Sequence, residues 1–66
     1  MNNIRKYRND KNITQKELAN KLGITQQMMS NYEKGYSTPN INLAKKIANE
    51  LDSDVENIFF DTKSKK

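Results

Sequence analysis

Five polar residues recur at helical spacing near the middle of this sequence: Gln26, Gln27, Ser30, Asn31 and Lys34. With about 100° of rotation per residue, a helix would place all of them on one arc of under half its circumference. Their donors and acceptors have lengths that suit base edges in the major groove of a duplex, where Gln or Asn pairs with adenine through two hydrogen bonds. A polar face exposed to solvent is the other interpretation. Because most amphipathic helices have such a face, this helix by itself favours the second interpretation.

The helix that would carry these side chains follows another short helix across a tight turn. Thr14 is a good N-cap, and Glu17 three residues later completes the pattern of a capping box. Gly23 provides the permissive backbone at which the first of the two helices ends, and Thr25 caps the second only two residues later. Helices joined so closely must cross steeply, and a small side chain such as Ala19 is expected where their axes approach.

Four residues carry a family resemblance. Gln15, Ala19, Gly23 and Met29 stand where the helix-turn-helix of phage Cro and repressor proteins, the Xre type, has its opening polar residue, small residue, turn glycine and core apolar residue. The rest of the chain also resembles that family: IRKYRNDKNIT its first helix, NYEKG the end of its recognition helix, and TPNINLAKKIANEL its fourth. The resemblance implies an all-α, compact five-helix repressor-like DNA-binding domain. It also favours the first interpretation of the polar face, in which the bases are read by Gln26, Gln27, Ser30 and Asn31.

Other residues are candidates for holding the duplex by its phosphates. Gln15 matches the family residue that bonds a phosphate and braces the first recognition glutamine. Lys34, Tyr36 and the backbone amides near Asn40 are further phosphate candidates, because cations and helix N-termini bind anions readily. Thr25, at the start of the recognition helix, is assigned to the same positioning group.

A first helix is expected over residues 2–11, with Ile4 and Tyr7 on its inner face. Arg8 lies four residues from Ile4, so its side chain should begin along the inward edge and needs a partner. The resemblance supplies that partner, because an arginine at this position in the family pairs with a glutamate that closes the recognition helix, here Glu33. The expected role of this ion pair is structural.

After the turn-rich segment KGYSTPN, Asn40 can cap a fourth helix, and Asp52 to Asp54 offer a cap for a short fifth one. Leu43 is displaced from the apolar stripe of the fourth helix. The residues expected in the core are Leu18, Leu22, Ile24, Met29, Ile41, Ile47 and Leu51. We expect one helix-turn-helix domain over residues 1–60 and a basic, disordered tail over residues 61–66.

The composition narrows the possible functions. A chain of 66 residues allows one domain with a small core, and without cysteine or histidine it lacks disulfides, thiolate ligands and the commonest general base. We therefore expect no enzyme, no metal, no cofactor and no small-molecule ligand. No apolar run approaches the length of a membrane span, so a cytoplasmic protein with no membrane partner is expected.

The net charge of +4 is unevenly distributed. Residues 1–13 are net positive, residues 41–61 are net negative, and the last residues are positive again. A DNA-binding module presents positive surface to phosphate and keeps acidic groups behind it, which agrees with this order. Ordinary scatter of charge over a solvated surface explains it equally well, so charge does not decide the function.

The sequence is therefore interpreted as a sequence-specific transcriptional regulator, a repressor whose recognition helix, about residues 25–34, enters the major groove of double-stranded DNA. One such helix reads few base pairs, so we expect a homodimer on a palindromic operator. The candidate dimer residues are Leu43, Phe59 and Phe60, because adjacent phenylalanines cannot both face inward on one short helix. The alternative for Phe60 is that it folds back and completes the core. The alternative function is an antitoxin-type or other protein-interaction module of helix-turn-helix fold.

Overall fold

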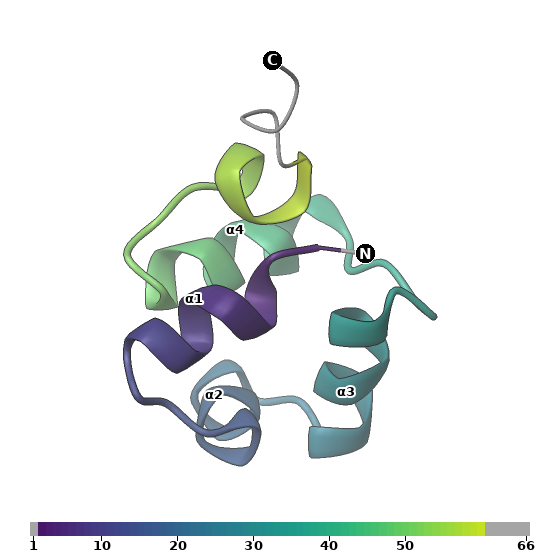
Figure 1. Ribbon diagram of the computed structural model, residues 1–66. Helices are drawn as coiled ribbons and strands as arrows, with labels where there is room; N and C mark the ends of the chain where they lie inside the picture. The colour runs from purple at the N-terminus through teal and green to yellow at the C-terminus, as the bar shows by residue number, and fades with distance from the viewer. Residues whose placement is uncertain (1, 61–66) are drawn as a thin grey trace.

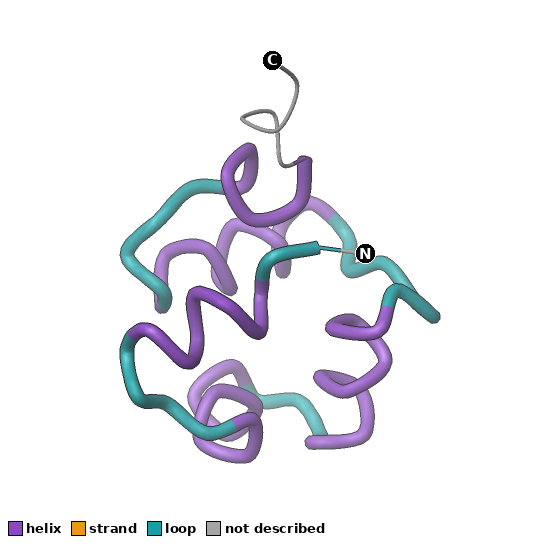
Figure 2. Tube along the Cα trace, viewed as in Figure 1, coloured by secondary structure: helices purple, strands orange, loops and turns teal. Residues whose placement is uncertain are grey.

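The computed structural model describes residues 2–60, which form helices and connecting turns and no strand (Figure 2). The elements of this part of the chain are α1 (Ile4–Asp10), α2 (Gln15–Leu22), α3 (Gln26–Lys34), α4 (Ile41–Glu50) and a π-helical segment, η1 (Glu56–Phe60). Helix α2 contacts α1, α3 and α4, while η1 packs on α1 (Figure 1). The all-α fold expected from the sequence is confirmed.

Side-chain caps fix where three of the helices begin. Thr14 Oγ1 accepts from the Glu17 amide at 3.0 Å, and Glu17 Oε1 accepts from the Thr14 amide at 2.9 Å, so the capping box of α2 is complete. Thr25 and Asn40 cap α3 and α4 with a single bond each, because their side chains accept from the amides of Met28 and Leu43. Gly23 ends α2 at a φ of 72°, in the left-handed region that glycine adopts at low cost. These local signals place α3 immediately after α2.

The core draws one completely buried side chain from each element: Ile4 from α1, Leu18 from α2, Met29 from α3, Ile47 from α4 and Ile58 from η1. Burying each of these contributes about 1.5–3 kcal/mol by the hydrophobic effect. Every element is therefore held by the same cluster, which fixes the position of α3 relative to the other four elements.

The expected core needs one correction. Ile41 is 60% exposed, so placing it in the core was wrong. It is the first residue of α4 and continues the apolar stripe of Ala44 and Ile47, but it lines an open groove at the surface and is not part of the core cluster. Leu22 and Ile24 are half-buried and pack against the core, as does Leu43.

The first helix is shorter than expected, because the backbone of Asn3 is not helical and serves as the N-cap position before Ile4. Asn2 Nδ2 donates to the Tyr32 carbonyl at 2.8 Å, and the Asn3 amide donates to the Ile58 carbonyl at 2.7 Å. These bonds tie the start of the chain to α3 and η1. At the other end, Asp54 Oδ1 caps the fifth element by accepting from the Asn57 amide at 3.0 Å, but the turn that follows is π-helical.

The basic tail expected over residues 61–66 lies outside the described residues, and the domain boundary at residue 60 stays a prediction. Among the helices of residues 2–60, none is long and apolar enough to cross a bilayer.

Candidate nucleic-acid interface

Helix α3 has one buried side and one polar side. Met29, Tyr32 and Glu33 are buried against the rest of the domain. On the other side Gln26, Gln27 and Lys34 are exposed, while Ser30 and Asn31 are half-buried. Gln27 Nε2 donates to Asn31 Oδ1 at 3.2 Å, so two of the expected base-reading residues are joined one helical turn apart.

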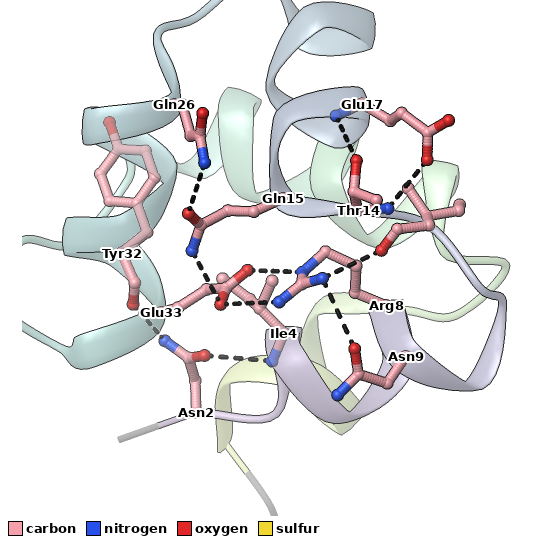
Figure 3. A network of polar contacts seen from close by, with 11 residues as sticks. Asn2, Ile4, Arg8, Asn9, Thr14, Gln15, Glu17, Gln26, Tyr32 and Glu33 are labelled. Carbon is pink, nitrogen blue, oxygen red and sulfur yellow. Dashed lines mark hydrogen bonds and ion pairs between the residues drawn. The ribbon is translucent and has the colours of Figure 1, made fainter.

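The buried side of α3 carries an ion pair to α1. Arg8 Nε lies 2.8 Å from Glu33 Oε2, and Arg8 Nη2 lies 3.2 Å from Glu33 Oε1, which is a bidentate arrangement (Figure 3). The two side chains are only 10% and 5% exposed. Arg8 Nη1 donates to the Ile13 carbonyl at 2.9 Å, so the guanidinium is satisfied on its remaining side as well. The pair suggested by the resemblance is thus present and buried.

Two glutamines connect this ion pair to the polar side of α3. Gln15 Nε2 donates to Glu33 Oε1 at 3.2 Å, and Gln26 Nε2 donates to Gln15 Oε1 at 3.3 Å. Figure 3 shows the resulting series of bonds running from Arg8 through Glu33 and Gln15 to Gln26. Gln15 therefore lies against the first of the expected base-reading residues.

Thr25 and Asn40 both act as helix caps. Thr25 Oγ1 accepts from the Met28 amide at 3.0 Å, and Asn40 Oδ1 accepts from the Leu43 amide at 2.8 Å. The Thr25 hydroxyl can still donate its own proton to an incoming acceptor. The bond from the Leu43 amide occupies the side-chain oxygen of Asn40, while its Nδ2 group and the backbone amides near it can donate to an anion.

A polar hollow lies between α1 and α3. Its lining includes Arg5, Lys6, Ser30, Lys34 and Tyr36. Lys34 Nζ sits 5.6 Å from the centre of the Tyr36 ring, within the range of a cation–π contact. Several cations therefore gather beside the polar side of α3.

Sequence reasoning missed Arg5 and Lys6 as candidates for the site. Their positive charge was visible in the sequence, but only the fold, in which the Arg8–Glu33 pair joins α1 to α3, brings them to this hollow. Spacing along a single helix cannot show which neighbouring helix faces it.

An apolar groove lies elsewhere on the domain. Its lining includes Pro39, Ile41, Val55, Phe59 and Phe60. Phe60 is 66% exposed, so the alternative in which it completes the core is wrong. Phe59 is half-buried and packs against the core cluster.

Of the expected dimer residues, Leu43 is not among the residues that line this apolar groove, whereas Ile41 is. The sequence did contain a signal for the exposure of Ile41, which is its position as the first residue of a helix, where side chains are least often packed by other elements.

Comparisons with known proteins agree with this geometry. The family model described as Helix-turn-helix matches residues 4–58. An uncharacterized HTH-type transcriptional regulator of Methanocaldococcus jannaschii is 41% identical over 58 residues, covering 88% of this chain and 88% of that protein. Another from Methanothermobacter thermautotrophicus is 40% identical over 57 residues, covering 85% of this chain and 83% of its own length. A third, from Archaeoglobus fulgidus, is 38% identical over 56 residues, with coverage of 85% and 79%.

Proposed function

Because this chain belongs to the Xre-type helix-turn-helix family of DNA-binding transcription regulators, we propose that it is a repressor that binds a palindromic operator as a homodimer. The family is generally non-enzymatic. The observation that carries the proposal is the polar side of α3, which projects from a helix held rigidly by caps, core and a buried ion pair.

In this proposal, α3 lies in the major groove and its polar side chains contact base edges. The base-reading residues are Gln26, Gln27, Ser30 and Asn31. The amides can each donate and accept, which suits adenine, while the hydroxyl of Ser30 can do either. Their exposure or half-burial leaves them accessible to a duplex.

Other side chains would hold the phosphates on either side of the groove. These are Gln15, Thr25, Lys34, Tyr36 and the amides near Asn40. Arg5 and Lys6 add positive charge in the same polar hollow. Such contacts set the position of the protein without reading sequence.

The homodimer is proposed from the apolar groove and from the small size of the reading helix. A two-fold contact presents the same patch from both subunits, and it places two copies of α3 at half-sites one or more helical turns apart. Ile41 and Phe60 are exposed at this groove, and burying them is favourable. Phe59 lines the groove and packs against the core, and Leu43, which packs against the core outside the groove lining, is kept as a further candidate for the dimer contact.

The test is selection of bound duplexes from a random pool, followed by titration of the selected duplex at several salt concentrations. The expected result is an inverted repeat and an affinity that falls steeply with salt, because bound phosphates release counterions. Occlusion of a promoter carrying that repeat would then be measured by transcription in vitro. A pool that yields no preferred sequence would reject the proposal and favour a protein-interaction module, whose mainly apolar contact would respond weakly to salt.

A further inference from the structure

We propose that Glu33, acting through Gln15, fixes which end of the Gln26 amide faces the bases, and so limits Gln26 to adenine in one orientation of the base pair. Glu33 is buried and its carboxylate bonds to Arg8 and Gln15, so it would act on the bases only through Gln15, as a positioning residue. The inference rests on the proposed function, because it concerns how the same helix α3 reads sequence.

The Glu33 carboxylate sets the direction of every hydrogen bond in the series. A carboxylate paired with a guanidinium has lone pairs and no proton to donate, so it can only accept. Glu33 Oε2 accepts from Arg8 Nε at 2.8 Å, and Glu33 Oε1 accepts from Arg8 Nη2 and from Gln15 Nε2, each at 3.2 Å. Of the two ends of the Gln15 amide, only the nitrogen can face such a group.

The orientation of Gln15 then determines that of Gln26. With its nitrogen toward Glu33, Gln15 must direct its oxygen away from the carboxylate. That oxygen accepts from Gln26 Nε2 at 3.3 Å. The nitrogen end of Gln26 is therefore held toward Gln15, which leaves its oxygen and its second N–H to face outward.

The orientation of the Gln26 amide matters for reading a base. Adenine presents N7 as an acceptor and its N6 amino group as a donor, side by side and in a fixed order. A glutamine amide matches both only if its N–H faces N7 and its oxygen faces N6. Reversing the amide would bring donor against donor and acceptor against acceptor, so a fixed Gln26 discriminates the orientation of the base pair as well as its identity.

Gln27 provides a contrast on the same helix. Its amide nitrogen donates to Asn31 Oδ1 at 3.2 Å. Both partners are neutral amides, and a pair of amides can bond in either order if both reverse together. The base pair read by Gln27 is therefore an internal control that changes at Glu33 should leave alone.

The experiment measures base preference at each operator position for the wild type, Gln26→Ala, Gln15→Met and Glu33→Gln. Gln26→Ala identifies the base pair that Gln26 reads. At that pair the wild type should prefer one base by about 5- to 150-fold, the discrimination expected of a two-bond contact. In Glu33→Gln the new side chain can donate as well as accept, so the amides of Gln15 and Gln26 can each bond in either orientation. In Glu33→Gln and Gln15→Met the preference should fall below about threefold there and stay unchanged at the pair read by Gln27.

The outcomes separate this inference from the function on which it rests. A wild type without any sequence preference would reject the proposed function. A wild type with a preference that Gln26→Ala removes, but that Glu33→Gln leaves intact, would overturn the inference alone. Uniform weakening on all sequences in Glu33→Gln would also overturn it, because that result indicates only a structural role.

Two further measurements cover the case in which Glu33→Gln does not fold. The double variant Arg8→Met, Glu33→Gln leaves no unpaired buried charge, and it should show the same loss of preference at the Gln26 base pair. In the free wild type, side-chain amide ¹⁵N relaxation should show the Gln15 and Gln26 amides to be more rigid than that of the exposed Asn20. Equal mobility of all three would contradict the proposal.

Discussion

Arg8 and Glu33 lie 25 residues apart in the sequence and form a bidentate, buried ion pair between α1 and α3. The pair does more than join two helices, since Glu33 Oε1 also accepts from Gln15. Buried pairs of this kind gain little over a well-packed apolar pair, but removing one member leaves the other charge unpaired. The stability of the domain should therefore be sensitive to each residue separately.

We expect Arg8→Met or Glu33→Gln to lower the free energy of unfolding by up to about 3–5 kcal/mol, because each change strands a buried partner. For a domain whose whole stability is of order 5–15 kcal/mol, that loss approaches unfolding. The double variant should lose less than the sum of the two. Denaturant and thermal melts of all three variants measure the coupling, and effects that add within error would mean that the two residues do not interact.

Lys11 and Asp52 offer a matched control for the Arg8–Glu33 pair. They form an ion pair that joins the end of α1 to the turn after α4, but their side chains are 36% and 75% exposed. Solvent screens such a pair, so Lys11→Met should cost at most about 1 kcal/mol, and the loss should shrink further at high salt. Urea melts at low and high salt test this expectation. A salt-independent loss as large as that of Arg8→Met would show that exposure does not decide the energetics.

Much of the fold follows from local signals in the sequence. Thr14, Gly23, Thr25 and Asn40 mark helix ends through their own side chains or backbone, so α2 and α3 and the start of α4 could be placed from short segments. The shortened start of α1 could not. Asn2 bonds to Tyr32, 30 residues away, and no periodicity reports a contact at that distance.

The limits on predicting the site have the same origin. Helical spacing correctly grouped the polar residues of α3 on one side, because that property belongs to a single helix. It assigned Ile41 to the core, because spacing identifies a face but not where the covering elements end. The series from Arg8 to Gln26 spans three helices, and only the family resemblance hinted at parts of it.

Base reading and phosphate binding should respond differently to substitution. Gln27→Ala removes a proposed base contact, so it should cost about 1–3 kcal/mol on the preferred duplex and relax the preference at one base pair. Asn31→Ala should behave similarly, because its side chain bonds to Gln27. Competition titrations against single-base operator variants provide the measurement. An unchanged ranking of those variants in Gln27→Ala would show that this side of α3 does not read the bases.

Lys34→Ala is the comparison on the same helix. Its ammonium lies in the polar hollow beside Tyr36, where it is expected to contact a phosphate and not a base. All duplexes should then be weakened by a similar factor, and the slope of log affinity against log salt should fall by about one unit. A selective loss on one operator variant with the salt slope intact would instead assign Lys34 to base reading.

The proposed dimer contact lies at the apolar groove. Phe60 is 66% exposed and Ile41 is 60% exposed, so Phe60→Ser and Ile41→Ser remove little from the core of one subunit. A two-fold contact buries both copies of each residue. Losing about 1.5–3 kcal/mol per side chain should therefore raise the dimer dissociation constant by at least about 100-fold. Sedimentation across a concentration series measures this change, with far-ultraviolet circular dichroism to show that each variant remains folded.

Tyr36→Ser is the control, because Tyr36 is 75% exposed and is not part of the lining of the apolar groove. Its loss should leave the sedimentation of the free protein unchanged. A monomeric wild type at every concentration would contradict the dimer. A Phe60→Ser variant that stays dimeric would place the contact elsewhere. If Phe60→Ser becomes monomeric while Tyr36→Ser does not, operator occupancy by Phe60→Ser should also rise more steeply with protein concentration, because two subunits must then assemble on the DNA.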